Sequence, residues 1–184
     1  FHVLGKLQNI IWISGRNRNL LDNQFLFERV DKYSDVVFFD DCGKNLSVSN
    51  FYDIISGDMT INAKNVRSYS LPFEEAPKFA FTTNYVPTDF NSSTEARMLY
   101  LVYSDYYHQM TSENDYLETR SIRDDFGRDL FGRDYPEELW NADLNFLMQC
   151  CKFYLSLAGE NIKIQPPMGN ILKRKYKADM GANF

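Results

Sequence analysis

The stretch DVVFFDDCGKN, Asp35–Asn45, decides the predicted fold. Four apolar residues, Val36–Phe39, run directly into two adjacent aspartates, Asp40 and Asp41. The length of this run and its β-branched and aromatic content indicate a buried strand. Continuous rather than alternating hydrophobicity is typical of a strand covered on both faces, as in a parallel sheet. Because neighbouring carboxylates at a strand end repel each other and lose hydration, we expect a ligand that compensates for both.

The neighbouring segments predict an alternation of strands and helices. Apolar runs of strand length occupy residues 9–14, 78–84 and 98–107, and helical spacing occurs at 24–30 and 46–56. Residues 59–73 alternate apolar and polar side chains around a polar turn, which predicts a β-hairpin. Helical patterns follow from Ser112 onward, and one of them ends at Gly159. The predicted fold class is therefore α/β, with a mostly parallel sheet, a β-hairpin insertion and a helical C-terminal region.

The composition permits a sizeable core and narrows the classes of function. Of 184 residues, 44% are hydrophobic, so disorder is not expected. The net charge of −5 argues against a protein that nucleic acid covers on all sides, but it allows a local basic loop. Cys42, Cys150 and Cys151 do not have zinc-site spacing, and no apolar run reaches the ~18 residues of a membrane span, so we expect a reduced, cytoplasmic setting. Cys150 and Cys151 are predicted to lie in a helical core.

Polar side chains end two predicted strands at the edge where ligands of open α/β sheets bind. Asp40 and Asp41 end one strand, and Thr82–Asn84 end another. Mg²⁺ prefers one or two carboxylates, completed by water and phosphate oxygens. These residues therefore predict a nucleotide-hydrolysis site in which Asp40 holds Mg²⁺, Asp41 polarises the attacking water and Asn84 orients it. In the alternative interpretation, the aspartates cap the next turn and Asn84 lies in a turn before Pro87.

Four segments in order resemble the motifs of superfamily-3 helicases. VVFFDD, ISGDMTINAKN, APKFAFTTNYVP and STEARMLYLVYSDYYH resemble the Walker B motif, the hairpin region, motif C and the arginine-finger segment of that family, above all in phage and mobile-element primase-helicases. The resemblance covers about residues 22–157. It implies an AAA+-like P-loop NTPase fold, ATP and Mg²⁺ as cofactors, and a hexameric ring that moves on DNA in the bacterial cytoplasm. It also implies a partial ATPase core at 1–107 and a helical region at 108–184.

The same resemblance implies roles for individual residues. Asp40 and Asp41 are similar to the Mg²⁺ ligand and the catalytic acid of Walker B, and Asn84 is similar to the motif C sensor. Arg97 is similar to the finger that a neighbouring subunit points at the γ-phosphate, although relatives often carry two arginines where this chain has Ala96–Arg97.

The hairpin carries the DNA-binding residues that the resemblance implies. Lys64, Asn65 and Arg67 lie where the family's hairpin reaches single-stranded DNA in the central channel. A solvated lysine and a helix-end or ion-paired arginine are the alternative explanations of Lys64 and Arg97. The basic run Lys173–Lys177 fits either a nucleic-acid patch or a solvated helix face.

The sequence does not contain the phosphate-binding loop of this family, G-x-x-x-x-G-K-[ST]. We expect Phe1–Leu7 to be the end of the helix that follows this loop. We also expect the 184-residue chain alone to bind ATP weakly or not at all and to show no turnover. Two other functions stay open. One is a ring or interaction module that does not bind nucleotide, and the other is a Mg²⁺-dependent nuclease or phosphotransferase that uses Asp40, Asp41 and Asp58.

Overall fold

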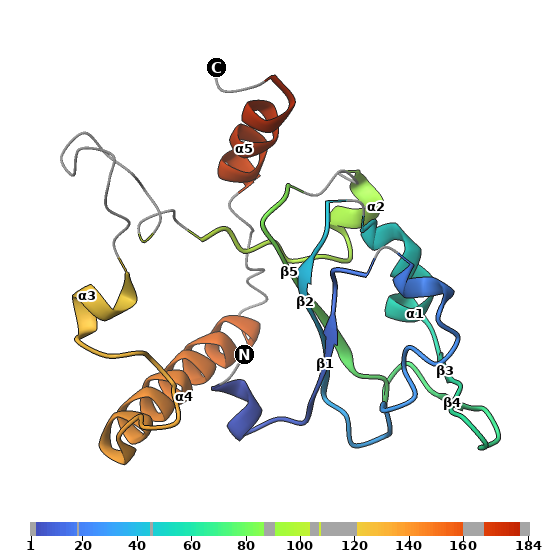
Figure 1. Ribbon diagram of the computed structural model, residues 1–184, viewed down its shortest axis with the longest axis horizontal. Coiled ribbons are helices and arrows are strands. Elements are labelled where there is room, and N and C mark those ends of the chain that lie inside the picture. The colour runs from blue at the N-terminus through green and yellow to red at the C-terminus, as the bar shows by residue number, and fades with distance from the viewer. Residues whose placement is uncertain are drawn as a thin grey trace. The chain divides into compact units, whose positions relative to one another are not determined.

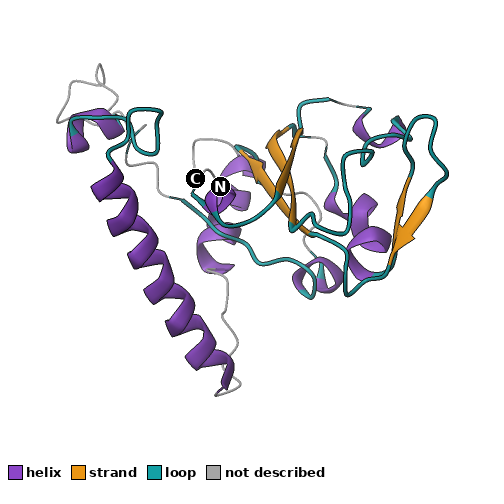
Figure 2. Cartoon of the chain, turned by 90° about the horizontal axis from the view of Figure 1, so that it is seen from below, coloured by secondary structure: helices purple, strands orange, loops and turns teal. Residues whose placement is uncertain are grey.

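A computed structural model of the protein describes residues 3–17, 19–44, 46–86, 91–103, 107, 121–159 and 168–180. The chain divides into two compact units (Figure 1), one of Val3–Tyr100 with Met168–Phe184 and one of Leu101–Pro167. The secondary structure combines strands and helices (Figure 2), so the predicted α/β class is confirmed at this level.

A parallel three-stranded sheet forms the centre of the first unit. β2 (Val36–Cys42) lies in the middle of the sheet, between β1 (Ile10–Ser14) and β5 (Lys78–Thr83). Phe38 and Phe39 are only 3% and 0% exposed although they point to opposite faces, which confirms that β2 is covered on both sides. Parallel pairing brings the carboxyl ends of all three strands to one edge.

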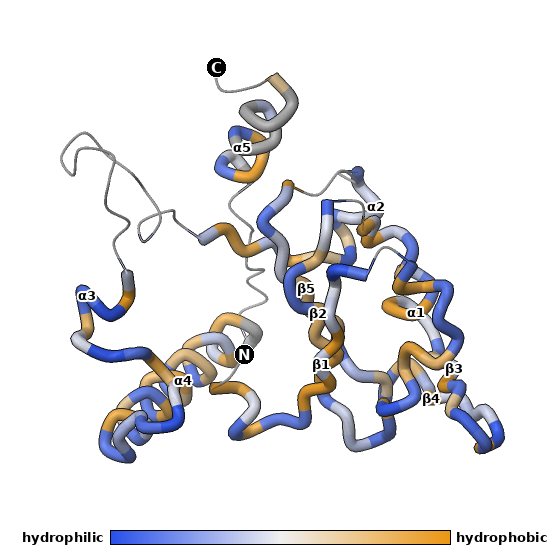
Figure 3. Tube along the Cα trace, viewed as in Figure 1, coloured by the Kyte–Doolittle hydropathy of each residue, from blue (hydrophilic) through white to orange (hydrophobic). Residues whose placement is uncertain are grey.

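Short helices and a hairpin precede, connect and follow these strands. The helices are η1 (Leu4–Lys6), η2 (Leu20–Asp22), η3 (Val48–Phe51), α1 (Tyr52–Ser56) and α2 (Ser92–Glu95). The predicted hairpin is confirmed, since β3 (Met59–Ile61) pairs antiparallel with β4 (Tyr69–Leu71). Its buried apolar residues, Met59, Ile61 and Leu71, lie at the paired strands, whereas the connection between the strands is mostly polar (Figure 3), with Val66 exposed. The hydroxyl of Tyr69 donates to the carbonyl of Val30 at 2.7 Å and ties the hairpin to the core.

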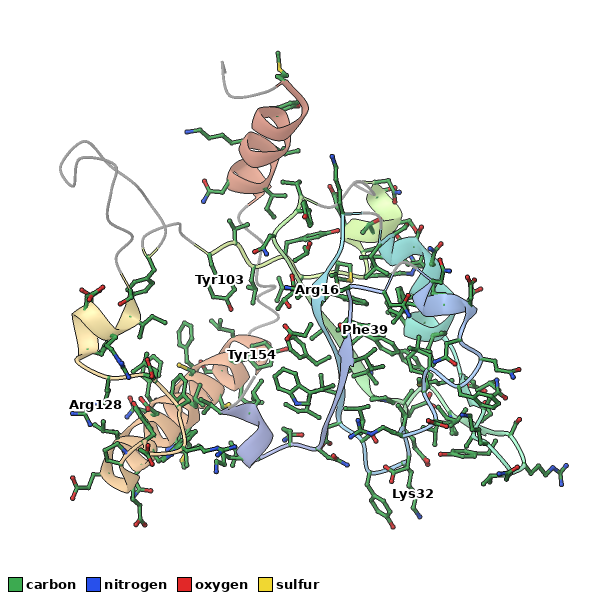
Figure 4. All side chains as sticks on the ribbon, viewed as in Figure 1. Arg16, Lys32, Phe39, Tyr103, Arg128 and Tyr154 are labelled. Atoms are coloured by element: carbon green, nitrogen blue, oxygen red, sulfur yellow. The ribbon has the colours of Figure 1, made fainter. Side chains whose placement is uncertain are left out.

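The core of the first unit lies on the side of the sheet that faces α1 and the hairpin (Figure 4). Phe39 of β2 stacks on Phe81 of β5, with ring centroids 5.0 Å apart, and packs against Phe51 at 5.1 Å. Such aromatic pairs contribute about 0.5–1.5 kcal/mol each beyond their burial. This packing holds β2 and β5 in register up to Phe39, and it thereby determines where the polar residues after Phe39 lie.

The second unit contains helices. α3 (Ile122–Phe126) begins with a capping box between Ser121 and Asp124, and Gly127, with φ 66°, ends it. α4 (Glu137–Gly159) ends at the predicted glycine. In the first unit, α5 (Met168–Met180) carries the basic run Lys173–Lys177.

Two predicted elements are wrong. Residues 24–30 form a series of turns rather than a helix, because their hydrogen bonds join residues three apart, as from Glu28 N to Phe25 O at 3.1 Å. Seven residues are too few to offset the cost of helix nucleation without strong packing. Residues 98–103 of the predicted strand 98–107 do not belong to a strand, Tyr107 lies in a turn, and residues 104–106 lie outside the described part of the chain.

The prediction for two cysteines is also wrong. Cys150 and Cys151 are exposed rather than buried, and none of the described side chains of α4 is buried. A stripe of apolar residues on a helix indicates burial only where another element covers it, and the sequence pattern does not identify that element.

Candidate functional site

The predicted strand end at Asp40 and Asp41 contains a β-bulge. Phe39 pairs with Phe81, but the next pair joins Cys42 to Thr83, so β2 has one residue more than β5 over this interval. Asp41 accommodates the extra residue of β2 by adopting a φ of 54°. This is a left-handed conformation that aspartate tolerates better than most residues. Bulges redirect side chains and often lie beside active sites. Here the bulge separates the directions of the two carboxylates.

The hydroxyl of Thr82 holds both sides of the bulge. It accepts a hydrogen bond from the backbone N–H of Asp41 at 2.9 Å and donates one to Oδ1 of Asp40 at 3.0 Å. Thr83 donates to the carbonyl of Cys42 at 2.9 Å. The two threonines of the predicted TTN sequence therefore position the aspartates, in addition to any role of Asn84.

Gly15 allows the end of β1 to approach the bulge closely. Its N–H donates to the carbonyl of Asp40 at 2.7 Å, and its carbonyl accepts from Gly43 N at 3.3 Å. A Cβ at Gly15 would lie 2.5 Å from Cys42 Sγ and 2.8 Å from Cys42 Cα, so no larger residue fits without a shift of the backbone. This approach brings Arg16 to the carboxyl edge of the sheet.

Arg16 forms an ion pair with Asp41. Both Nε and Nη2 of Arg16 contact a single carboxylate oxygen, Oδ2 of Asp41. The side chains are 78% and 35% exposed, respectively, so the pair faces solvent. The sequence did not indicate Arg16, because the mostly polar segment that follows β1 resembles many surface turns. Its place directly after a strand, at the same edge as Asp41, was the available signal.

A pocket of about 640 Å³ opens at this edge. Its polar wall includes two cations, Arg16 and Lys44, and two carboxylates, Asp41 and Asp22. Its other lining residues are Gly15, Asn17, Asn19, Leu20, Leu21, Cys42, Gly43, Leu46, Asn50, Asn84 and Tyr85. The volume lies within the usual range for small-molecule sites, but the lining is more polar than the mostly apolar walls of such sites.

The pocket joins two of the predicted catalytic residues. Asp41 from the end of β2 and Asn84 just after β5 both line it, whereas Asp40 does not and is exposed at its side, bonded to Thr82. Oxygen donors of this kind suit Mg²⁺, which needs only one or two protein carboxylates. No group of three or more His, Cys, Asp or Glu that could hold a metal occurs among the described residues. Asp41 and Asn84 could supply one or two oxygen ligands to a Mg²⁺, which would need its other ligands from water and phosphate.

Cys42 lies behind the bulge. Burial, with the charges of Asp40 and Asp41, raises the pKa of the Cys42 thiol to about 11, and a hydrogen bond with the Thr82 backbone opposes this rise. The thiol is therefore neutral at physiological pH and contributes to packing rather than to the charge of the pocket.

Arg97 lies at α2 and not in this pocket. Its Nε donates to Ser56 Oγ at 2.8 Å, its Nη1 donates to the carbonyl and hydroxyl of Ser93, and its guanidinium lies 4.9 Å from the centre of the Tyr52 ring. Beneath it, the buried Thr94 bonds with the Tyr52 hydroxyl and with Oδ1 of Asn91. In this chain Arg97 thus fastens α2 to α1.

The predicted DNA-binding residues lie together at the hairpin tip. Asn65 has φ 60° and makes the turn, Arg67 is exposed, and Lys64 lies over the Phe25 ring at 5.7 Å. Asp58 is at the base of the hairpin, where it accepts from Phe73 N at 3.1 Å and does not line the pocket.

Comparisons with known proteins do not assign the chain to a family. No family model matches the chain, and a search of curated proteins found no match. None of the described helices is both long and apolar enough to cross a membrane.

Proposed function

We propose that this chain is the ATPase part of a DNA helicase of superfamily 3, with an AAA+-like P-loop NTPase core. In this proposal, ATP with Mg²⁺ binds at the carboxyl edge of the sheet, and hydrolysis drives a ring of subunits, hexameric in this family, along single-stranded DNA. The observation that carries the proposal is that Asp41 and Asn84, from two neighbouring strands, line one pocket at that edge. Asn84 is within reach of the pocket to orient a water that Asp41 polarises.

The resemblance to superfamily 3, and not the pocket, supplies the proposed roles of the remaining residues. Asp40 holds Mg²⁺ through water at the mouth of the pocket, and Thr82 keeps its carboxylate in place. In this proposal Arg97 acts on the nucleotide of a neighbouring subunit, and to do so its guanidinium has to leave the bonds to Ser56 and Ser93 that it makes in its own chain. Lys64, Asn65 and Arg67 contact the DNA backbone from the hairpin tip.

The first test measures ATP hydrolysis by the protein produced from its complete reading frame. Asp41→Asn should lower the rate at least a hundredfold while ATP binding persists, because electrostatic positioning supplies most of the catalysis in phosphoryl transfer. Asp22→Asn is the matched control, since Asp22 is another carboxylate of the same pocket and should leave the rate within a few-fold of wild type. Equal rates for Asp41→Asn and wild type would refute the proposal. The 184 residues alone should show no turnover, because their sequence lacks the phosphate-binding loop.

The second test concerns DNA. Lys64→Ala should weaken binding of a single-stranded oligonucleotide and reduce the salt dependence of the affinity by about 0.7 log units per log unit of salt, the value for one lost phosphate contact. Fluorescence anisotropy at several salt concentrations measures both. Lys32→Ala is the matched control, because Lys32 also lies over an aromatic ring, at 5.0 Å from the centre of Tyr33. If both variants bind as wild type does, the hairpin is not the DNA contact.

The nuclease alternative has weaker support. It requires Asp58 beside Asp40 and Asp41, but Asp58 bonds to the backbone of Phe73 at the hairpin base. DNA cleavage that requires Mg²⁺ and disappears in Asp41→Asn would favour this alternative. A protein that neither hydrolyses ATP nor cleaves DNA would favour the interaction module.

A further inference from the structure

The ion pair between Arg16 and Asp41 occupies the wall of the proposed nucleotide pocket. It binds the carboxylate that the proposed chemistry requires, and the resemblance assigns no role to Arg16. Both donors of the guanidinium converge on one oxygen of Asp41, so the pair lacks the two parallel bonds of the strongest arginine–carboxylate geometry. The pair is therefore not arranged for the greatest stability, which points to a role in function.

Because the ion pair is exposed, a phosphate can readily replace the Asp41 carboxylate as the partner of Arg16. Because the side chains of Arg16 and Asp41 are 78% and 35% exposed, their ion pair contributes little to stability. A phosphate chain offers more charge and more acceptor oxygens than one carboxylate, and guanidinium groups match phosphate geometry. An anion of this kind within the pocket can therefore take Arg16 from Asp41 at little cost.

The backbone at this point supports a movement of the side chain alone. Gly15 is held by bonds to the carbonyl of Asp40 and the N–H of Gly43. The backbone next to Arg16 therefore stays at the sheet edge while the guanidinium turns. Lys44 lines the same pocket and supplies a second cation for a phosphate chain.

The rest of the lining favours a nucleoside phosphate over a bare anion. Leu20, Leu46 and Tyr85 give the pocket an apolar and aromatic wall, and Asn17 and Asn50 offer amide donors and acceptors. A base and a ribose need walls of this composition, whereas inorganic phosphate uses only the cations.

We propose that Arg16 is the phosphate ligand of this pocket and a latch on Asp41. Without nucleotide, Arg16 neutralises Asp41. When the phosphate chain binds, Arg16 transfers to it and releases the Asp41 carboxylate for water. The proposal rests on the nucleotide site proposed above, and it adds a phosphate-binding residue, Arg16, and a mode of regulation.

The first experiment uses inorganic diphosphate and ADP without Mg²⁺ as probes of the 184-residue chain. The Nε–Hε signal of Arg16 in an NMR spectrum should shift as either probe is added, and Arg16→Lys identifies this signal by its absence. Arg123 is the internal control, because it forms an exposed ion pair with Asp129 at 2.9 Å, and its signal should not move. An Arg16 signal that stays unchanged at millimolar diphosphate and ADP overturns the proposal, whether or not any variant folds.

Calorimetric titration gives the size of the effect. Arg16→Ala should weaken ADP binding about 10- to 100-fold, as expected for the loss of hydrogen bonds to a charged group. Arg123→Ala should bind ADP as wild type does. ADP should bind more tightly than diphosphate if the apolar wall holds the base, and equal affinities would overturn the assignment to nucleoside phosphates. If Arg16→Ala weakens the binding of an oligonucleotide but not that of ADP, the assignment of the pocket to a nucleotide is overturned.

A double-mutant cycle tests the latch itself. Both Asp41→Asn and Asp22→Asn remove a negative charge that repels the phosphates of ADP. Asp41→Asn also frees Arg16, so it should strengthen ADP binding more than Asp22→Asn does. In an Arg16→Ala background, the two substitutions should have the same effect, since repulsion alone then remains. Equal effects in the wild-type background would overturn the latch.

The outcomes also separate this inference from the proposed function. If Asp41→Asn abolishes ATP hydrolysis but Arg16→Ala leaves ADP binding unchanged, the function stands and the latch fails. If Arg16 binds ADP but Asp41→Asn leaves hydrolysis unchanged, the phosphate site stands and the catalytic proposal fails.

Discussion

Replacing Gly15 by alanine tests whether the close approach of β1 to the bulge organises the site. The added Cβ would lie 2.5 Å from Cys42 Sγ, 2.8 Å from Cys42 Cα and 3.0 Å from the carbonyl oxygen of Asp40. Two of these atoms belong to the backbone and cannot turn away, so β1 and β2 must separate by several tenths of an ångström. Overpacking of this kind costs about 1–3 kcal/mol. For a chain of this length, the melting temperature should fall by about 2–12 °C.

Gly43→Ala is the matched control for this prediction. Gly43 lines the same pocket and bonds to Gly15, but a Cβ there meets no atom within 4 Å. Its melting temperature, measured by circular dichroism, should equal or slightly exceed that of wild type, since alanine restricts the unfolded chain. Gly15→Ala should also move the Arg16 Nε–Hε signal, because the ion pair with Asp41 depends on this approach. A melting temperature equal to that of wild type, or an equal loss in Gly43→Ala, would refute the reasoning.

Two further predictions concern two buried residues, Thr94 and Cys42. Thr94→Val should lower the free energy of unfolding, measured in urea, by about 1–3 kcal/mol, because the Tyr52 hydroxyl loses a buried hydrogen-bond partner. The control Thr60→Val, at an exposed position on β3, should change this free energy by less than about 0.5 kcal/mol. Iodoacetamide should alkylate the exposed Cys150 and Cys151 quickly and Cys42 only after unfolding, since Cys42 is buried and its pKa is raised. Mass spectrometry of the labelled chain measures this order, and early labelling of Cys42 would contradict the buried position of the thiol.

The strands and the hairpin could be predicted from the sequence because their patterns are local. The continuous apolar run of β2 and the alternation of Met59 and Ile61 depend only on which faces are buried. The segments at 24–30 and 98–107 carry comparable apolar content but were predicted wrongly. Whether such a segment becomes a helix, a strand or a series of turns depends on the partner it packs against, which the segment itself does not specify.

The candidate site could be predicted in part. The rule that ligands bind at the carboxyl edge of a parallel sheet pointed to Asp41 and Asn84, and both line the pocket. The contribution of Arg16 could not be predicted from its own surroundings in sequence. A polar turn after a strand looks the same whether or not it faces a carboxylate that lies 25 residues away in sequence.

The apolar run and the two aspartates after it determined that a buried parallel strand would end in acidic groups. The tertiary structure decided that Asp41, and not Asp40, faces the pocket. The physical reason is the bulge, which arises from the pairing of β2 with β5 and from the Thr82 hydroxyl, 41 residues after Asp41. Because that pairing depends on the packing of Phe39 against Phe81, the aromatic core directs which carboxylate meets Arg16.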